Sequence, residues 1–309
     1  YLDFDRAQPP PPAQYKGVEV MAGPHGLKPQ PDVLYENDGG GRFTDITAIS
    51  GCGSVKPAFG LNLVMVDFDR DGWLDISVAN DSMPGFLFRN LGVTDGQARF
   101  EEVGAASGMS ANVDGSNQAA MGLAIGDIDG NGFPDKFTTV FSSDTNALHM
   151  NSEGRLFEDR SQQYGLGMVS RPFLGWSCGF FDFDHDGDLD LAVANGHETR
   201  ANVRDYERQF WRHDRFVAGS ANDPVADLYF RTAAGRRQAD QASYGGWQSN
   251  VLLLNEGDRE WPDVAWLWGL ALPADSRNVL VEDLDGDGRL DLVVTTQEEW
   301  PERRQRLLV

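Results

Sequence analysis

Four short acidic segments carry the residue types and the spacing that a metal ion needs. The most regular one is Asp182-Phe-Asp184-His-Asp186-Gly-Asp188-Leu-Asp190, with carboxylates at positions 1, 3, 5 and 9 and glycine at position 6. Alternate side chains of a tightly turned loop can point at one centre, and the glycine permits a backbone turn with positive φ. A hard cation with roughly six to eight oxygen ligands suits such a loop, and calcium is the first candidate.

The same pattern begins three more times, at Asp67, Asp127 and Asp283, so we expect about four calcium ions. Residue 7 of each loop is expected to bind through its main-chain carbonyl oxygen. The expected metal-binding positions are Asp67, Asp69, Asp71, Trp73, Asp75, Asp127, Asp129, Asn131, Phe133, Asp135, Asp182, Asp184, Asp186, Asp188, Asp190, Asp283, Asp285, Asp287, Arg289 and Asp291. Because Asn131 replaces a carboxylate, the second loop is predicted to release its ion first.

A structural role for these ions is favoured over a catalytic one. Loops built from carboxylates saturate the ion and leave little room for a substrate, and four copies exceed what catalysis needs. Magnesium fits less well because its strict octahedron suits fewer protein oxygens.

The residues around each loop predict strands rather than the helices of an EF-hand. Position 12, which is glutamate in an EF-hand, is valine or threonine in all four loops. The flanking runs are apolar and rich in β-branched residues, which favours strands. The predicted strands are 61–66, 122–125, 178–181 and 278–281 before the loops, and 76–79, 137–140, 191–194 and 292–295 after them.

A second hairpin signal recurs between the loops. Segments that begin at Val33, Phe86, Ala147 and Val251 share an apolar start, an asparagine, a glycine-containing turn, then an aromatic and an acidic residue. We predict units of four strands, in which this hairpin precedes the metal-clamped one. Such repeats predict an all-β propeller of about five to seven blades, as one domain over residues 1–309.

Two stretches depart from the repeat. Residues 1–32 are atypical and include the proline run 9–12, which predicts an extended surface loop. Residues 196–249 are interpreted as an insertion or a degenerate blade, because the last loop follows the third after nearly twice the usual spacing. Within them, 204–216 has a spacing compatible with a helix and is predicted to project and contact a partner. Trp211 and Trp247 are candidate ligand contacts.

Composition argues against two classes of partner. The net charge is −22, with 48 acidic and 26 basic residues, so nucleic acid and anionic membranes are disfavoured. No apolar stretch is long enough for a transmembrane helix, and no signal peptide is visible. Tyr1 opens inside what resembles a repeat, so we expect residues upstream of it. Cys52 and Cys178 are expected to be free thiols, although a bridge between them stays open.

Catalytic motifs are missing from the sequence. There is no GxSxG, P-loop or CxxC pattern, and the five histidines show no zinc-site spacing. His197 and Glu198, directly after a predicted strand, are candidates for a functional role or for loop packing. Of the tryptophans, Trp261 occupies the aromatic position of the repeat and is expected to pack, whereas Trp176, Trp266 and Trp268 could stack on carbohydrate.

The loops, together with Phe59-Gly60, Met121-Gly122 and Leu174-Gly175-Trp176, resemble FG-GAP/VCBS repeats. More specifically, the chain resembles cartilage-acidic-protein-like proteins that carry an ASPIC/UnbV segment. The segments that match are 23–27, 144–148, 171–176 and 194–197, although His25 stands where arginine is usual and the ASPIC/UnbV segment itself is not evident.

This resemblance implies a calcium-bound β-propeller that is secreted, periplasmic or on the cell surface. We expect a non-enzymatic binding or scaffold module for a protein or glycan, or a subunit of a surface assembly. The alternative is a carbohydrate-active enzyme of the lyase or dehydratase type, or a lectin, with its site at the mouth of the propeller channel.

Overall fold

Strands dominate the computed structural model, which describes residues 2–3, 13–15, 18–20, 24, 27–142, 144–205, 242–257 and 260–309. In these ranges the helical segments are single turns: α1 Thr47–Ser50, η1 Cys52–Ser54, α2 Gly104–Ser107 and α3 Leu166–Ser170. None of the described helices is long and apolar enough to span a bilayer. The chain is therefore all-β, as the sequence predicts.

The chain divides into two compact units. The first consists of Tyr1–Pro10, Gly23–Thr138 and Ala147–Arg160, and the second of Pro11–Ala22, Thr139–Asn146 and Ser161–Val309. Whether residues 1–309 act as one domain stays a prediction.

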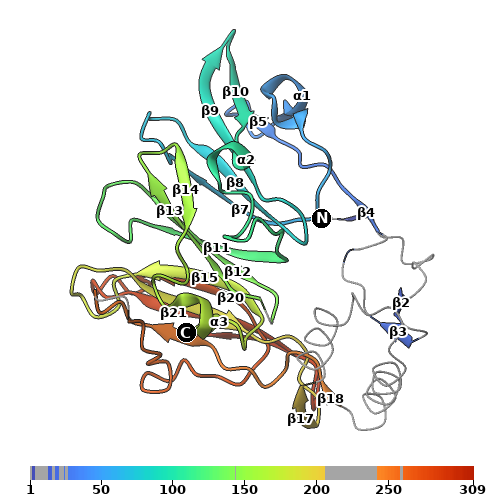
Figure 1. The fold of residues 1–309 in the computed structure, drawn as a ribbon, viewed down its shortest axis with the longest axis vertical. Helices are drawn as coiled ribbons and strands as arrows, with labels where there is room; N and C mark the ends of the chain where they lie inside the picture. Colours follow the sequence, from blue (N-terminus) through green and yellow to red (C-terminus); the bar gives the residue numbers. More distant parts are fainter. Residues whose placement is uncertain are drawn as a thin grey trace. The chain divides into compact units, whose positions relative to one another are not determined.

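The first unit contains two four-stranded antiparallel sheets (Figure 1). The first sheet is formed by β7 Gly60–Val66, β8 Asp75–Asn80, β9 Phe86–Thr94 and β10 Gln97–Glu102, each paired with the next. The second sheet repeats this order with β11 Ala120–Gly126, β12 Asp135–Val140, β13 Ala147–Ser152 and β14 Leu156–Asp159.

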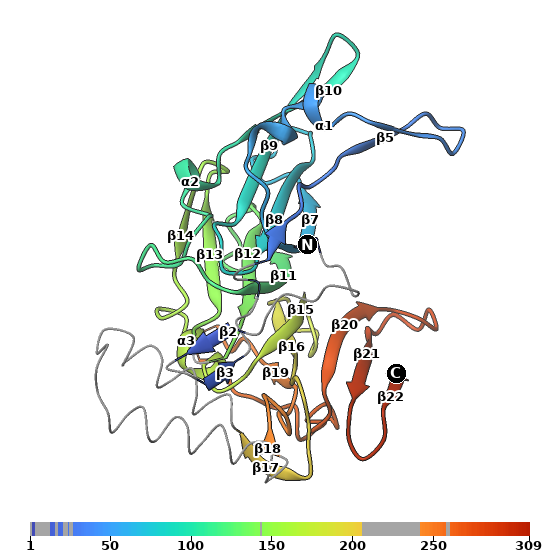
Figure 2. The same ribbon diagram turned by 90° about the vertical axis from the view of Figure 1, so that its right-hand side faces the viewer.

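Two three-stranded sheets form most of the second unit (Figure 2). The third sheet is β15 Gly175–Phe181, β16 Asp190–Asn195 and β19 Val251–Leu253, and Leu253 also bridges to Asp263 where a fourth strand would lie. The fourth is β20 Ser276–Glu282, β21 Asp291–Glu298 and β22 Arg304–Leu308. The eight strands predicted around the loops are all confirmed.

Short strand pairs complete the described structure. They are β1 Leu2–Asp3 with β4 Lys28–Pro29, β2 Ala13–Tyr15 with β3 Val18–Val20, β5 Tyr35–Asn37 with β6 Phe43–Asp45, and β17 Asn202–Asp205 with β18 Ala242–Ser243. The first three pairs are antiparallel, and the last is parallel.

The order of hairpins within a sheet differs from the prediction. The metal-type hairpin comes first in each four-stranded sheet, and the asparagine hairpin follows it. The physical reason is a set of hydrogen bonds, described below, that joins each of the first three loops to the hairpin after it rather than to the one before.

The long spacing before the fourth loop arises inside the third sheet. Strand β16 pairs directly with β19. Just beside this pairing, the side-chain oxygen of Asn250 accepts a hydrogen bond from the Asn195 amide, although the two residues are 55 positions apart in the sequence. The long connection therefore joins two neighbouring strands of the same sheet. Most of the predicted helix at 204–216, including Trp211, lies outside the described residues, as does the proline run at 9–12.

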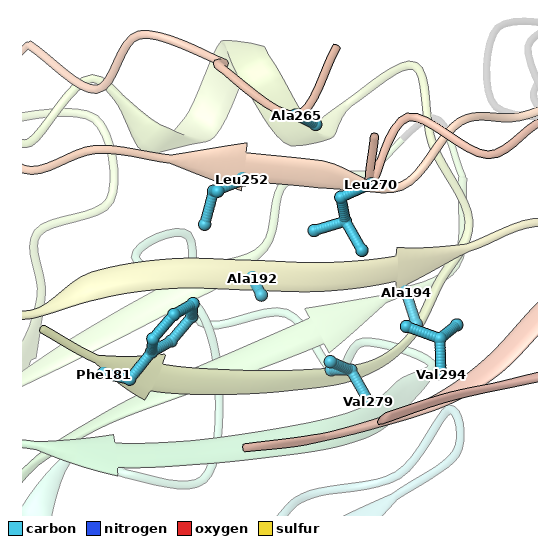
Figure 3. Close-up of a cluster of buried hydrophobic side chains, with 8 residues drawn as sticks. All are labelled: Phe181, Ala192, Ala194, Leu252, Ala265, Leu270, Val279 and Val294. Carbon is cyan, nitrogen blue, oxygen red and sulfur yellow. The ribbon is translucent and has the colours of Figure 1, made fainter. Parts of the chain in front are cut away.

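Within each unit, buried side chains lie between the sheets. Every residue of β8, β12 and β16 is buried, so both faces of these strands are covered. In the second unit, Phe181, Ala192 and Leu252 belong to a cluster that also includes Val279 and Val294 of the fourth sheet (Figure 3). In the first unit, Phe68 meets Phe157 edge to face at 5.5 Å. Both cysteines are buried free thiols.

Candidate metal centres

Each acidic loop joins the first two strands of a sheet and gathers carboxylates at one point. Three carboxylates in every loop offer oxygen atoms that all lie within 4.8 Å of one another. In the first loop they come from positions 1, 3 and 5, and in the other three from positions 1, 3 and 9. The sets are Asp67, Asp69 and Asp71; Asp127, Asp129 and Asp135; Asp182, Asp184 and Asp190; and Asp283, Asp285 and Asp291.

The aspartate at position 1 shapes the turn. Asp67 Oδ1 accepts the Asp71 amide at 3.1 Å, and Asp67 Oδ2 accepts the Gly72 amide at 2.9 Å. The same two bonds recur in the second, third and fourth loops. The loop backbone is thus folded around its first carboxylate, which leaves the other carboxylates on the same side.

Two positions in every loop have a left-handed backbone. The glycine at position 6 has a positive φ, as predicted, with values between 87° and 98°. Position 4 also has a positive φ, which the residue types do not indicate, because two loops have glycine there but the others have Arg70 and His185 at φ 61° and 62°. A side chain in this conformation costs roughly 1–2 kcal/mol.

The aspartate at position 9 is fixed by two backbone amides in the first three loops. Asp75 is buried; its Oδ2 accepts the amide of Phe68, at position 2, and its Oδ1 accepts the amide of Asn90 in the next hairpin. Asp135 and Asp190 make the equivalent pairs of bonds. Asp291 has the bond to position 2.

An asparagine completes this arrangement, and we call it the asparagine latch: Asn90, Asn151 and Asn255. The main-chain N–H of each asparagine donates a hydrogen bond to the aspartate at position 9. Its side-chain nitrogen donates another to the carbonyl of position 8. Each also accepts the amide of a glycine in its own turn. The sequence pattern revealed these asparagines as turn residues, but it missed that they tie the loop to the following hairpin.

Burial makes the closing carboxylates hard to ionise without a cation. Desolvation raises the pKa of Asp75 and of Asp135 to about 6, against the lowering effect of their backbone hydrogen bonds. Desolvation also raises the pKa of Asp190, and burial together with the charges of Asp71 and Asp67 raises that of Asp69. A bound cation would favour the ionised form of all four.

The donor sets fit a hard divalent cation. Two oxygens bound to one ion at about 2.4 Å can be at most about 4.8 Å apart, and the carboxylate oxygens of each cluster lie within that distance. The clustered ligands are all carboxylates, whereas zinc in proteins commonly takes nitrogen or sulfur. Binding through the carbonyls of Trp73, Phe133, Asp188 and Arg289, and through Asn131, Asp186 and Asp287, stays a prediction. In the fourth loop, Arg289 pairs with Asp287 at 2.7 Å, and its hydrogen bond lowers the pKa of Asp287.

The other predicted residues fall into packed and exposed groups. Trp261 is buried, as its repeat position predicts. His197 lies between the rings of Trp176 and Tyr244, with centroid distances of 5.8 Å and 5.4 Å, which favours the packing interpretation. Glu198 is paired with Arg200.

Trp247, Trp266 and Trp268 are the exposed tryptophans of the described second unit that sequence analysis singled out. Trp247 donates its ring nitrogen to the Arg200 carbonyl. Trp268 is 65% exposed, yet its ring meets Phe183, at position 2 of the third loop, edge to face at 5.3 Å.

The fold and the loops together define a class of protein: all-β chains in which repeated aspartate loops join the strands of each hairpin. Comparison with known protein families agrees with this class. The model of the FG-GAP-like repeat matches residues 20–78, 67–138 and 127–193, which together cover more than half of the chain. The chain belongs to this family, whose repeats imply a β-propeller.

Two curated relatives are similar over about half of the chain. Cartilage acidic protein 1 of Xenopus tropicalis is 29% identical over 176 residues, and cartilage acidic protein 1 of Mus musculus is 26% identical over 175 residues. Each alignment covers 54% of this chain and 25% of the relative, so the chain matches about a quarter of the length of these proteins.

Proposed function

We propose that the chain is a calcium-stabilised binding or scaffold module that acts outside the cytoplasm, with about four structural calcium ions. The observation that carries this proposal is the asparagine latch. Because the carboxylate that closes each of the first three loops also accepts an amide from the next hairpin, an ion in the loop would stabilise all four strands of a blade.

The charge of the loops gives the ions their energetic importance. Without cations, three or four carboxylates repel one another within each loop, and the buried ones bind protons more readily, as the raised pKa values of Asp75 and Asp135 indicate. Calcium concentrations outside the cytoplasm suit modules whose loops bind in the range of roughly 10⁻⁴–10⁻³ M. The proposed extracytoplasmic location would supply calcium at such concentrations.

The tryptophans beside the third loop are the surface that we propose for a protein or glycan partner. Trp266, Leu267 and Trp268 are 70%, 58% and 65% exposed in one run. Aromatic residues are enriched at binding hot spots. Because Trp268 contacts Phe183 and the Phe183 amide donates to Asp190, calcium in the third loop would position this surface.

The proposal is tested by binding with and without calcium. The whole chain, immobilised, is screened against an array of glycans and an array of extracellular proteins, in calcium and in chelator. We expect a partner that is retained in calcium, lost in chelator and weakened by Trp268→Ala, whereas Tyr35→Ala, at an exposed aromatic residue of the first unit, serves as the control. Two results contradict the proposed surface: the wild type and Trp268→Ala retain the partner equally well, or the partner binds to the same extent with and without calcium.

A further inference from the structure

The first two acidic loops are joined by side-chain hydrogen bonds. Both loops belong to the first unit, and the residue that joins them is Asn151, the latch of the second sheet. Its side-chain nitrogen donates to the Pro134 carbonyl in the second loop and also to the Phe68 carbonyl in the first loop, at 2.9 Å each. The corresponding nitrogens of Asn90 and Asn255 donate to position 8 of their own loops.

A line of hydrogen bonds runs through Asn151 from one closing carboxylate to the other. Asp135 Oδ1 accepts the Asn151 amide at 2.7 Å, and the Asn151 side chain donates to the Phe68 carbonyl. The Phe68 amide then donates to Asp75 Oδ2 at 3.0 Å. None of these four residues is more than 2% exposed. Because water cannot replace a lost partner here, a movement of one carboxylate disturbs the other.

The segment that begins at Asn151 also touches clustered or predicted ligands of both loops. Asn131, at position 5 of the second loop, donates its side-chain nitrogen to the Asn151 carbonyl at 3.0 Å. At the other end of the turn, a β-carbon on Gly154 would lie 2.2 Å from the α-carbon of Asp69. Asp69 belongs to the carboxylate cluster of the first loop. Residues 151–154 therefore pack without a gap between the two loops.

Arg70, at position 4 of the first loop, provides a second contact between the loops. Its guanidinium carbon lies 5.6 Å from the centre of the Phe133 ring in the second loop. Its Nη1 would be 2.6 Å from a β-carbon on Gly132. A cation over an aromatic face is attracted to the ring. Phe133 is at position 7, where the main-chain carbonyl is a predicted ligand, so this contact also reaches the second metal site.

We propose that the first and second loops bind calcium cooperatively, with Asn151 as the positioning residue that couples them. This inference rests on the proposed calcium binding and adds its regulation. An ion in the second loop would fix Asp135 and Asn131, which both bond to Asn151, and would thereby fix Phe68 in the first loop. Part of the ordering that the first loop needs is then complete before its own ion binds, which favours binding.

Charge acts in the opposite direction. Each loop carries an excess of carboxylates, so an ion in one loop lowers the negative potential that attracts an ion to the other. Salt screens charges in solvent over roughly 8 Å at 0.15 M, whereas buried hydrogen bonds are screened much less. At this ionic strength we expect the hydrogen-bonded contacts to decide the sign of the coupling.

Trp73 gives the first loop a spectroscopic signal of its own. It occupies position 7, where the other loops have Phe133, Asp188 and Arg289. Terbium is a hard cation that takes oxygen ligands as calcium does, and its luminescence rises when a nearby tryptophan transfers excitation energy to it. Each chain is measured with and without Trp73→Phe. The difference reports terbium in the first loop, because the other tryptophans contribute to both measurements.

The first test measures the terbium Kd of the first loop at 0.15 M salt with the second loop intact or disabled. Asp127→Asn/Asp129→Asn disables the second loop by changing two of its clustered carboxylates. We expect the first loop to bind roughly fivefold more weakly, or weaker still, when the second is disabled. In an Asn151→Ala background, which lacks the bond to Phe68, the same change should weaken it by less than about twofold. Asn90→Ala is the matched control, because it removes a latch without removing the bridge, and the full effect should remain.

A second measurement does not depend on whether Asn151→Ala folds. Coupling between two binding sites is reciprocal, so disabling the first loop must weaken the second by the same factor. Phe133→Trp combined with Trp73→Phe moves the luminescence signal to the second loop. Asp67→Asn/Asp69→Asn then disables the first loop, and we expect the terbium Kd of the second loop to rise by the factor found in the first test.

Three outcomes overturn the proposal. If the Kd of the first loop is unchanged or tighter when the second loop is disabled, calcium binding stands but the loops are independent or coupled by charge. If the weakening is equally large in the Asn151→Ala background, the coupling does not pass through Asn151. If the wild-type chain binds neither terbium nor calcium, the proposed calcium role fails together with the coupling.

Discussion

The first and second sheets share one design, and a buried cross-strand pair is among the places where they differ. Both have the aspartate loop, the closing carboxylate and the asparagine latch, in the same register. The first encloses Ile76 and Phe88, whereas the second encloses Lys136 and His149. Burial lowers the pKa of Lys136 to about 7, and burial with the Lys136 charge lowers that of His149 to about 4. The second sheet therefore carries a polar pair at a cost in stability that the first avoids.

Exchange of these pairs gives the largest expected effect. Ile76→Lys places a lysine in a fully apolar site and should reduce the free energy of unfolding by roughly 3–5 kcal/mol, because it buries an uncompensated charge. The double variant Lys136→Ile/His149→Phe copies the first sheet and should be neutral or stabilising. Urea denaturation in calcium measures both. A double variant that unfolds readily would show that the polar pair is structurally required.

The pH dependence of stability separates the two sheets next. The pKa of Lys136 is lower in the folded chain than in the unfolded chain, so between about pH 7 and pH 10 the unfolded chain binds more protons and stability rises with pH. From pH 7 to pH 9 the gain should be roughly 2 kcal/mol. Lys136→Met should lose this rise, and Lys56→Met should keep it. Parallel pH profiles for the wild type and Lys136→Met would argue against a buried amine.

The latches should differ in strength. Asn151 donates its side-chain nitrogen to the carbonyls of Pro134 and Phe68, whereas Asn90 donates to Leu74. The extra bond joins the second sheet to the first loop. Asn151→Ala should therefore cost about 1.5 kcal/mol more than Asn90→Ala, because the buried Phe68 carbonyl also loses its partner. Equal losses of stability would mean that the Phe68 contact contributes little.

The smallest effect concerns position 4 of the loops. Gly130 has φ 68°, and a β-carbon there would meet nothing within 4 Å. Gly130→Ala should cost about 1 kcal/mol through backbone conformation alone. Ala in place of Arg70, which already has φ 61°, should change stability less. Calorimetric Tm values of the two variants, measured in calcium, compare them directly.

Sequence reasoning succeeded where the pattern is local. The aspartate spacing and the apolar runs around it predicted each loop and both of its strands, because a hairpin and its turn are encoded in neighbouring residues. The buried Trp261 followed from the aromatic position of the repeat. The positive φ of the glycine at position 6 followed from its lack of a β-carbon.

What sequence reasoning missed depends on contacts between distant residues. The order of the hairpins follows from the bond between Asp75 and the Asn90 amide, 15 residues apart, which no local pattern reveals. Lys136 follows directly after an aspartate loop and looks like a surface residue, so its burial became visible only with the packed sheets. The left-handed backbone at Arg70 was hidden because the side chain gives no sign of it.

Calcium binding to the loops is tested most directly by counting ions and unfolding the same sample. Native mass spectrometry in calcium should show about four bound ions, and excess chelator should remove them. Ligand binding stabilises the folded state by roughly 3–4 kcal/mol per site at about 100–1,000 times Kd, so Tm should fall sharply in chelator. The loop with Asn131 should empty first, and Asn131→Asp should delay its loss. A chain that binds no calcium, or an unchanged Tm after complete removal of the ions, would contradict a structural role for calcium.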